Sequence, residues 1–359
     1  MLDKKNLLGL TQQQLNEFFS QIGEKPYRTK QLMQWIYHKN VYEFNEMLNL
    51  SKSLRLKLIS VANLDLPKVA QQNFAQDGVI KWLLDLDINN QIEMVYIPEK
   101  DRGTLCISSQ VGCSLACTFC STGMQGFNRN LKTEEIVAQV VMAKKYLMSK
   151  NRNISNVVFM GMGEPLLNEK AVFDACNLLL DDMAFGLSRR KVTISTSGVV
   201  PALIRMAQQT PVSLAISLHA PNDELRDVLV PINQKYPIKT LLEACNNYLD
   251  SGEQQRHILI EYVMLDGVND TVEHANKLVK LLKGMPIKVN LIPFNSFEKT
   301  QYNTSKTATI KHFQDVLHKS GIRTMTRRTR GDGVDAACGQ LAGKVTDKTK
   351  RSLINNGRN

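Results

Sequence analysis

From residue 100 onward the sequence alternates short apolar runs with longer amphipathic stretches, and this alternation restricts the fold more than any other feature. Six runs read as strands: TLCISS, NVVFM, KVTIST, VSLAIS, HILIEYVM and IKVNLIPF. Helical stretches such as TEEIVAQVVMAKKYLM and TVEHANKLVKLLKG lie between them. Strands that alternate with helices favour a parallel α/β fold. The sequence therefore predicts a partial, TIM-like barrel of six strand–helix units.

Polar segments directly follow the predicted strands. The segments GMGEP, STSG, SLHAPND and PFN each stand at the end of a strand. In parallel barrels the active site is built at the carboxyl ends of the strands, so we expect these segments to form one site. Taken alone, a residue in such a segment is more typical of a capping or hydrogen-bonding role. The candidate residues are Gly163, Glu164, Ser195, Ser217, Leu218, His219 and Asn295.

The chain before the barrel falls into two segments. Residues 11 to 62 read as helical, with Thr11 and Ser51 as candidate N-caps. The runs VIKWLLDLDI and QIEMVYIPE then flank Asn89 and Asn90 and predict a β-hairpin. We expect a helical accessory domain at 1–66, a hairpin extension at 67–99, a barrel with a cysteine-bearing C-terminal loop at 100–343 and a basic tail at 344–359.

Three of the seven cysteines, Cys113, Cys117 and Cys120, form a C-x3-C-x2-C cluster after the first predicted barrel strand. A structural zinc site requires a fourth ligand. The histidines closest in sequence, His38 and His219, are both distant. Three thiolates are enough for a [4Fe–4S] cluster, which then keeps one iron open for another ligand. The spacing therefore favours an iron–sulfur cluster over zinc.

The chain carries an excess of positive charge. Lys and Arg total 45 against 34 Asp and Glu, which gives a net charge of +11. This excess suggests nucleic acid as a partner, although a basic solvated surface would look the same. Arginines gather in RTMTRRTR, and the tail adds more basic residues. No apolar run approaches the length of about 20 residues that a membrane span needs, so we expect a cytoplasmic protein without membrane contact.

The cysteine spacing resembles that of the radical S-adenosylmethionine superfamily, in which Phe119 would match an aromatic of the motif. Longer blocks are similar to the RlmN/Cfr family of radical RNA-adenosine methyltransferases, from residue 90 to about residue 350. These blocks are RGTLCISSQVGCSLACTFCSTGMQGFNRNL, GMGEPLLN, VTISTSGVVPAL, AISLHAPND, EYVML and RTRGDGVDAACGQLAG. They fit the branch that methylates carbon 2 of adenine.

The resemblance implies a [4Fe–4S] cluster on the three clustered cysteines and S-adenosylmethionine bound by the polar strand ends, with two molecules used per turnover. It also implies that Cys338 carries the methyl group, that the radical formed from this group adds to carbon 2, and that Cys106 releases the product by a disulfide with Cys338. Glu93 is the implied proton acceptor, with Cys106 as a competitor. From the residues alone, Cys106 reads equally as a buried strand cysteine.

The resemblance also implies the partners. The substrates would be an adenosine of 23S rRNA in the peptidyl-transferase centre and the tRNA adenosine beside the anticodon, each exposed from its stack. An external, flavodoxin-like protein would supply electrons to a monomeric enzyme. Two alternatives stay open. One is a carbon-8 methyltransferase that confers antibiotic resistance, and the other is a non-catalytic iron–sulfur RNA-binding protein.

Overall fold

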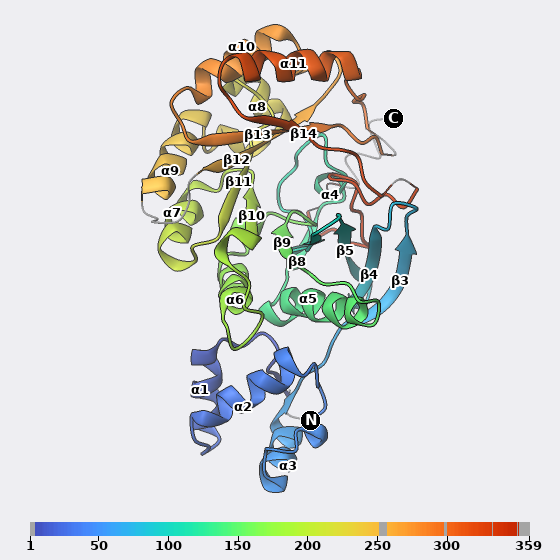
Figure 1. Ribbon diagram of the computed structural model, residues 1–359, viewed down its shortest axis with the longest axis vertical. Coiled ribbons are helices and arrows are strands. Elements are labelled where there is room, and N and C mark those ends of the chain that lie inside the picture. Colours follow the sequence, from blue (N-terminus) through green and yellow to red (C-terminus); the bar gives the residue numbers. More distant parts are fainter. Residues whose placement is uncertain (1–3, 251–256, 298–299, 332, 350, 352–359) are drawn as a thin grey trace.

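An N-terminal helical lobe is joined to a larger α/β body, which lies above the lobe in Figure 1. The structure is a computed structural model that describes residues 4–250, 257–297, 300–331, 333–349 and 351. The apolar core is continuous through both parts.

A ten-stranded sheet forms the body, in the order β14-β13-β12-β11-β10-β9-β6-β5-β4-β3. The strands from β6 to β14 run parallel, and β5, β4 and β3 extend the sheet as antiparallel neighbours. The six predicted barrel strands are confirmed in chain order. The strands are β3 (Lys68–Phe74), β4 (Ile80–Asp87), β5 (Asn90–Pro98), β6 (Gly103–Cys106), β9 (Asn156–Phe159), β10 (Val192–Thr196), β11 (Ser213–Ser217), β12 (Ile258–Met264), β13 (Ile287–Pro293) and β14 (Thr324–Thr326).

Helices connect the parallel strands and cover the outside of the curved sheet (Figure 1). Strands covered on both faces carry runs of buried apolar residues, as in β12 and β13. The result is an open, partial barrel, as the strand–helix alternation predicted. The helices of the body are α4 (Ser121–Met124), α5 (Thr133–Met148), α6 (Glu169–Leu180), α7 (Val200–Gln209), α8 (Asp223–Leu229), α9 (Ile238–Asp250), α10 (Val272–Leu282) and α11 (Thr307–Lys319).

The predicted hairpin is confirmed as β4 and β5, and Asn89 in its turn adopts the left-handed conformation that Asn tolerates. Two strands of the main sheet were missed. The edge strand β3 is polar and mostly exposed, so it has no apolar alternation, and β14 has only 3 residues. A separate antiparallel pair, β7 (Gln110–Gly112) with β8 (Phe127–Asn130), closes the base of the loop that carries the clustered cysteines.

The N-terminal lobe is helical, as expected. Thr11 and Ser51 cap the helices α1 (Gln12–Gln21) and α3 (Lys52–Val61), because each side chain accepts a backbone N–H in the first turn. Between them, α2 (Tyr27–Met33) continues into a π-helical turn. The strands β1 (Lys5–Asn6) and β2 (Ala62–Asn63) pair in parallel and bring the two ends of the lobe together.

The lobe packs on α5 and α6 of the body. Lys144 Nζ of α5 donates to Tyr37 O at 2.6 Å, and Gln14 Nε2 donates to Asp174 Oδ2 of α6 at 3.1 Å. The chain comes closest at Gly9, where an added Cβ would lie 2.3 Å from the backbone nitrogen of Glu134. These contacts therefore hold the lobe in a defined position on the body.

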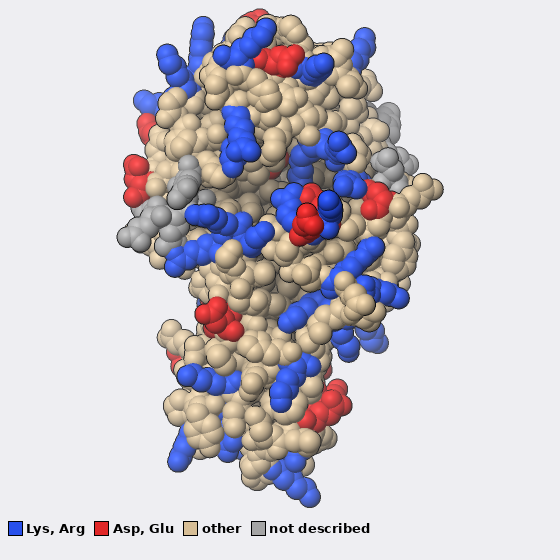
Figure 2. Space-filling model, in the orientation of Figure 1, with Lys and Arg blue, Asp and Glu red and all other residues tan. Residues whose placement is uncertain are grey.

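Lys and Arg outnumber Asp and Glu on the face of the molecule shown in Figure 2, over the lobe and over the body. Exposed basic residues include Arg189, Arg190 and Arg328. Among the helices that the structure describes, none has the length and apolar character to cross a membrane.

The close approach at Gly9 allows the position of the lobe on the body to be tested. The side chain of Gly9→Val would collide with the backbone at the start of α5, which cannot yield like a flexible side chain. We expect the lobe to loosen, so that limited proteolysis cuts the connection after β2 several times faster than in the parent. Gln13→Ala, an exposed change on α1, is the matched control. Equal cleavage of both variants would show that Gly9 does not determine the position of the lobe on the body.

Candidate active site

A cavity opens at the carboxyl ends of the parallel strands. Residues from β9, β10, β11, β12 and β13 contribute to its wall, together with the cysteine loop and the C-terminal segment. The residues predicted for the site that line it are Cys113, Cys117, Cys120, Gly163, Glu164, Ser195, Ser217, His219, Asn295 and Cys338.

Three predicted residues stand outside this wall. The side chain of Leu218 is fully buried. Its backbone N–H donates to Glu261 O, and its carbonyl accepts from Arg226 Nε and from the N–H of Ala220. Cys106 ends β6 and is only 8% exposed. Glu93 lies on β5 with its carboxylate engaged elsewhere, as described below.

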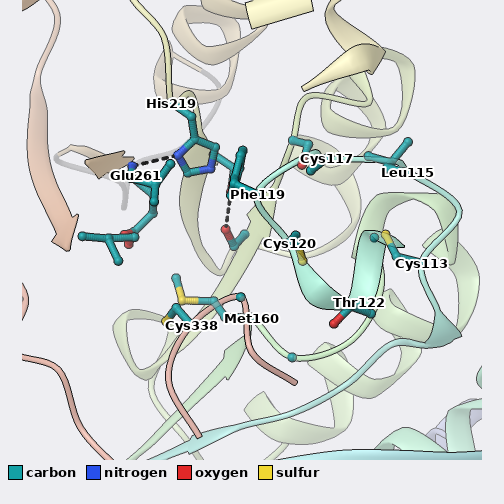
Figure 3. Close-up of a pocket in the computed structure, with 18 of the residues that line it drawn as sticks. Cys113, Leu115, Cys117, Phe119, Cys120, Thr122, Met160, His219, Glu261 and Cys338 are labelled. Atoms are coloured by element: carbon teal, nitrogen blue, oxygen red, sulfur yellow. Dashed lines mark hydrogen bonds between the residues drawn. The ribbon is translucent and has the colours of Figure 1, made fainter. Parts of the chain in front are cut away.

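The clustered cysteines lie in residues 113–126 between β7 and β8, a segment that includes α4 and that we call the cysteine loop. They lie along one side of the cavity (Figure 3). The backbone N–H of Cys113 donates to Gly126 O at 2.8 Å, and that of Cys120 donates to Cys117 O at 3.2 Å, so the loop has a fixed course. Burial raises the pKa of all three thiols, that of Cys117 to about 12. A bound metal would replace their protons.

The donor set fits an iron–sulfur cluster better than a single ion. Within the described residues, no group of three or more His, Cys, Asp or Glu side chains is arranged to hold one metal ion. A cubane cluster takes one thiolate on each of three irons, so its ligands need not meet at one point. Three thiols on one wall of a cavity, with room beside them, match that requirement.

The GMGEP segment forms the adjacent wall. Gly163 has φ of +100°, and an added Cβ would lie 2.5 Å from Gln110 Cβ, so this position requires glycine. The buried carboxylate of Glu164 accepts the N–H groups of Ser197 at 2.8 Å and Leu166 at 3.1 Å. Burial nevertheless raises its pKa. A carboxylate held in this way at a cavity wall suits the ammonium group of a ligand.

His219 is a neutral imidazole of fixed orientation. Its Nδ1 accepts the N–H of Val263 at 3.0 Å, which leaves the proton on Nε2. Burial lowers the pKa of His219 to about 3, so the ring carries no charge at neutral pH. The residue adopts a left-handed backbone conformation. Its ring packs edge to face against that of Phe119, with the two ring centroids 4.6 Å apart (Figure 3). His219 therefore connects a strand end to the cysteine loop.

Arg226 links the strand ends by hydrogen bonds to their backbone, and the sequence analysis did not identify it. This fully buried side chain on α8 donates to the carbonyls of Leu218 at 3.0 Å, Ser197 at 2.7 Å and Ser217 at 3.1 Å. Burial lowers its pKa to about 10, so it remains charged at neutral pH. An arginine among acidic residues on a helix reads as exposed, and no local signal indicated its burial.

Cys338 is held by a chain of polar and charged contacts that the sequence did not indicate. Arg327 Nη1 donates to Cys338 Sγ at 3.3 Å and lies 4.0 Å from Glu261 Oε2. The side chain of Glu261 is 4% exposed and accepts from Asn290 Nδ2 at 3.1 Å. Arg327 was grouped with the basic surface residues. Its side chain instead lines the cavity and is 31% exposed.

Cys106 is close enough to Cys338 for the two groups to interact electrostatically. Burial, followed by the proximity of Cys338, raises the pKa of the Cys106 thiol to about 12. Both cysteines are free thiols in the structure. The two residues predicted to pair are therefore neighbours that are not bonded.

Glu93 holds the loop that carries Cys338. Its Oε1 lies 3.1 Å from Lys81 Nζ, and its Oε2 accepts the N–H of Ala342 at 2.9 Å. Lys81 Nζ also donates to Asp335 O at 3.2 Å. The ion pair of Lys81 and Glu93 thus contacts both ends of the segment 335–342.

Comparisons with known proteins found matches to two protein families and to a solved structure. Residues 5–64 match the family described as the ribosomal RNA large subunit methyltransferase N-terminal domain, and residues 107–282 match the radical SAM superfamily. The crystal structure of a radical SAM methyltransferase from Sphaerobacter thermophilus superposes with a TM-score of 0.89 at 39% identity, covering 94% of this chain and 99% of that one.

Two relatives extend over almost the whole chain. The dual-specificity RNA methyltransferase RlmN of Ruthia magnifica subsp. Calyptogena magnifica is 70% identical over 351 residues, which cover 98% of this chain and 99% of the relative. The protein of the same name from Marinobacter nauticus is 52% identical over 353 residues, which cover 98% and 96%.

The burial of Cys106 predicts an order of alkylation for Cys106 and Cys338. At pH 8 a thiol with a pKa of about 12 is ionised in about one molecule in ten thousand, and the thiolate is the form that reacts. We expect iodoacetamide to modify Cys338 long before Cys106, measured by mass spectrometry of peptides from metal-free protein. In denaturant Cys106 should react readily. Equal rates in the folded protein would contradict this account of Cys106.

Proposed function

Because the chain belongs to the RlmN family of radical SAM methyltransferases, we propose that it makes 2-methyladenosine in 23S rRNA and in tRNA. The observation that carries the proposal is the combination of three groups around one cavity. These are the three-cysteine loop, the polar strand ends and Cys338 with Arg327 on its sulfur. A protein that only bound RNA would have no use for Cys338 in the same cavity as the three-cysteine loop.

The chemistry of adenine explains why both parts are needed. Carbon 2 is electron-poor and does not attack the methyl group of S-adenosylmethionine, so polar transfer fails. The [4Fe–4S] cluster and S-adenosylmethionine, when bound, supply the radical that takes a hydrogen atom from the methyl group on Cys338. We assign the cluster to Cys113, Cys117 and Cys120. We assign the contacts of S-adenosylmethionine to Gly163, Glu164, Ser195, Ser217, His219 and Asn295, with Leu218 acting only through its backbone.

The remaining steps belong to residues of the chain. Arg327 Nη1 donates to the sulfur of Cys338. This sulfur would take a methyl group from one S-adenosylmethionine, forming a thioether, releasing the thiol proton and leaving S-adenosylhomocysteine. After the adenine is bonded to this carbon, a base must remove the hydrogen of carbon 2. Glu93 is our candidate, and its contact with Ala342 places it beside the loop of Cys338. Cys106 then attacks the sulfur of Cys338, so that a disulfide forms, the bond between that sulfur and the methylene carbon breaks, and this carbon takes up a proton to become the methyl group of the product.

The relatives favour methylation at carbon 2. The reported relatives at 52% and 70% identity are both named RlmN, so the carbon-8 alternative is not favoured. The positive charge of the chain suits an RNA partner. The helical lobe would provide part of the RNA contact, an external flavodoxin-like protein would donate electrons, and the enzyme would act as a monomer in the cytoplasm.

The roles of the two cysteines can be separated by their variants. Cys338→Ala lacks the methyl carrier, so we expect neither 2-methyladenosine nor a protein–RNA adduct. Cys106→Ala should still form the bond to adenine but fail to break it, so that a covalent adduct accumulates on denaturing gels. Nucleoside mass spectrometry of 23S rRNA and tRNA measures the product. Normal turnover by Cys106→Ala without an adduct would refute its role, and 8-methyladenosine from the parent enzyme would refute carbon-2 methylation.

Two adjacent arginines allow methyl acceptance to be separated from RNA binding. Arg327 contacts Cys338, whereas Arg328 is exposed. We expect Arg327→Gln to slow methylation of Cys338 by tenfold or more without changing the salt dependence of RNA binding. Arg328→Gln, the matched control, should leave methylation of Cys338 unchanged. If Arg327→Gln instead weakened RNA binding and left methylation intact, Arg327 would be a phosphate contact.

A further inference from the structure

Arg351 of the C-terminal tail does not point to solvent, although a basic tail reads as an RNA contact. Its guanidinium donates to four backbone carbonyls of the cysteine loop. Nη1 lies 2.8 Å from Leu115 O, 2.9 Å from Gly123 O and 3.2 Å from Cys113 O. Nη2 lies 3.0 Å from Ser114 O. These carbonyls come from both sides of the loop.

Residues 340–349, which precede Arg351 in the sequence, lie across β5 and the cysteine loop; we call these residues the C-terminal strap. Side chains of the body hold it at intervals. Thr122 Oγ1 donates to Leu341 O at 2.6 Å, and Gln125 Nε2 donates to Gly343 O at 2.9 Å. Further along, the strap is bonded through Gln91 N to Lys344 O, Thr346 N to Asn90 Oδ1, Asn128 Nδ2 to Thr346 O, Phe127 N to Asp347 Oδ1 and Lys348 N to Phe127 O.

Close packing under the strap is a separate sign that the contact is built in. At Gly126, which ends the cysteine loop, an added Cβ would lie 2.1 Å from the carboxylate of Asp347. At Gly343 in the strap, an added Cβ would lie 2.3 Å from Gln91 O. Both positions therefore need glycine for the strap to lie where it does.

We propose that Arg351 is a positioning residue of the iron–sulfur site, which holds the cysteine loop in its cluster-binding course by gathering four of its carbonyl groups. The inference rests on the proposed assignment of Cys113, Cys117 and Cys120 as cluster ligands. Three thiols on an irregular loop lose conformational freedom when a cluster binds. A guanidinium that already links both sides of the loop reduces that loss.

The geometry favours Arg over Lys at this place. The planar guanidinium presents several N–H donors in fixed directions, whereas an ammonium is a compact group with three donors. Arg351→Lys should therefore restore only part of the effect. The nearby Lys348 is exposed on the same strap, and its charge acts on Asp87, which lies outside the cysteine loop. Lys348→Gln is thus a matched control that removes one charge without touching the loop.

The test compares Arg351→Gln, Arg351→Lys and Lys348→Gln as full-length proteins. In metal-free protein we expect Arg351→Gln to raise alkylation rates of the three loop cysteines several-fold, and to speed amide hydrogen exchange in residues 113–126 but not in the barrel strands. After anaerobic reconstitution, its cluster should be lost in air several-fold faster than that of Lys348→Gln, followed by absorbance and iron content. Arg351→Lys should fall between them.

Two outcomes would overturn the proposal. One is that Arg351→Gln matches Lys348→Gln in alkylation, exchange and cluster retention. The other is that exchange rises equally throughout the barrel, which would make Arg351 a general stabilising residue. Cys117→Ala tests the assumption beneath the proposal. If this variant kept a full cluster, the ligand assignment itself would fail, whatever Arg351 does.

Discussion

Cys338 faces the cavity because one buried ion pair holds its loop at both ends. Lys81 and Glu93 lie on neighbouring antiparallel strands, where Lys81 is opposite Val95 and Glu93 is opposite Leu83, so the two side chains are diagonal neighbours on one face. Lys81 bonds the start of the loop at Asp335, and Glu93 bonds its end at Ala342. The antiparallel extension of the barrel thus provides the platform for a reactive group that the parallel strands do not carry.

Under the proposed function, Glu93 would have two roles that compete. Its carboxylate contacts Lys81 and Ala342 and so holds the loop. As the proposed proton acceptor, it would have to approach carbon 2 of the substrate, and the uptake of a proton would weaken the pair with Lys81. Proton transfer would then be coupled to release of the Cys338 loop through the same carboxylate. The proposed role of Cys106 would need no such movement, because this residue already lies near Cys338.

The sequence predicted those features that are encoded locally. The spacing of Cys113, Cys117 and Cys120, the polar strand ends and the caps at Thr11 and Ser51 are each contained in a few consecutive residues. The side chains that hold the site together are not encoded in this way. Arg226, Arg327, Arg351 and Lys81 read as surface charges, and their partners are mostly backbone carbonyls or side chains on other elements. Their places follow from the tertiary fold, which a local pattern does not contain. The strands β3 and β14 were missed because one is polar and the other has 3 residues.

The distribution of these cations separates the sulfurs of one cavity into two chemical classes. Burial raises the pKa of Cys106 and of the three loop thiols, which keeps them protonated until a metal or a reaction partner takes the proton. Cys338 alone among them has a guanidinium hydrogen-bonded to its sulfur in the described structure. Arg351 supports the loop cysteines differently, because it bonds their backbone and not their sulfurs. A cation that donates to a sulfur promotes nucleophilic attack by that sulfur. A cation that donates to backbone carbonyls fixes the position of the loop without creating a competing nucleophile. Under the proposed function, the placement of Arg327 would direct the methyl group to Cys338, although four other thiols lie in or beside the same cavity.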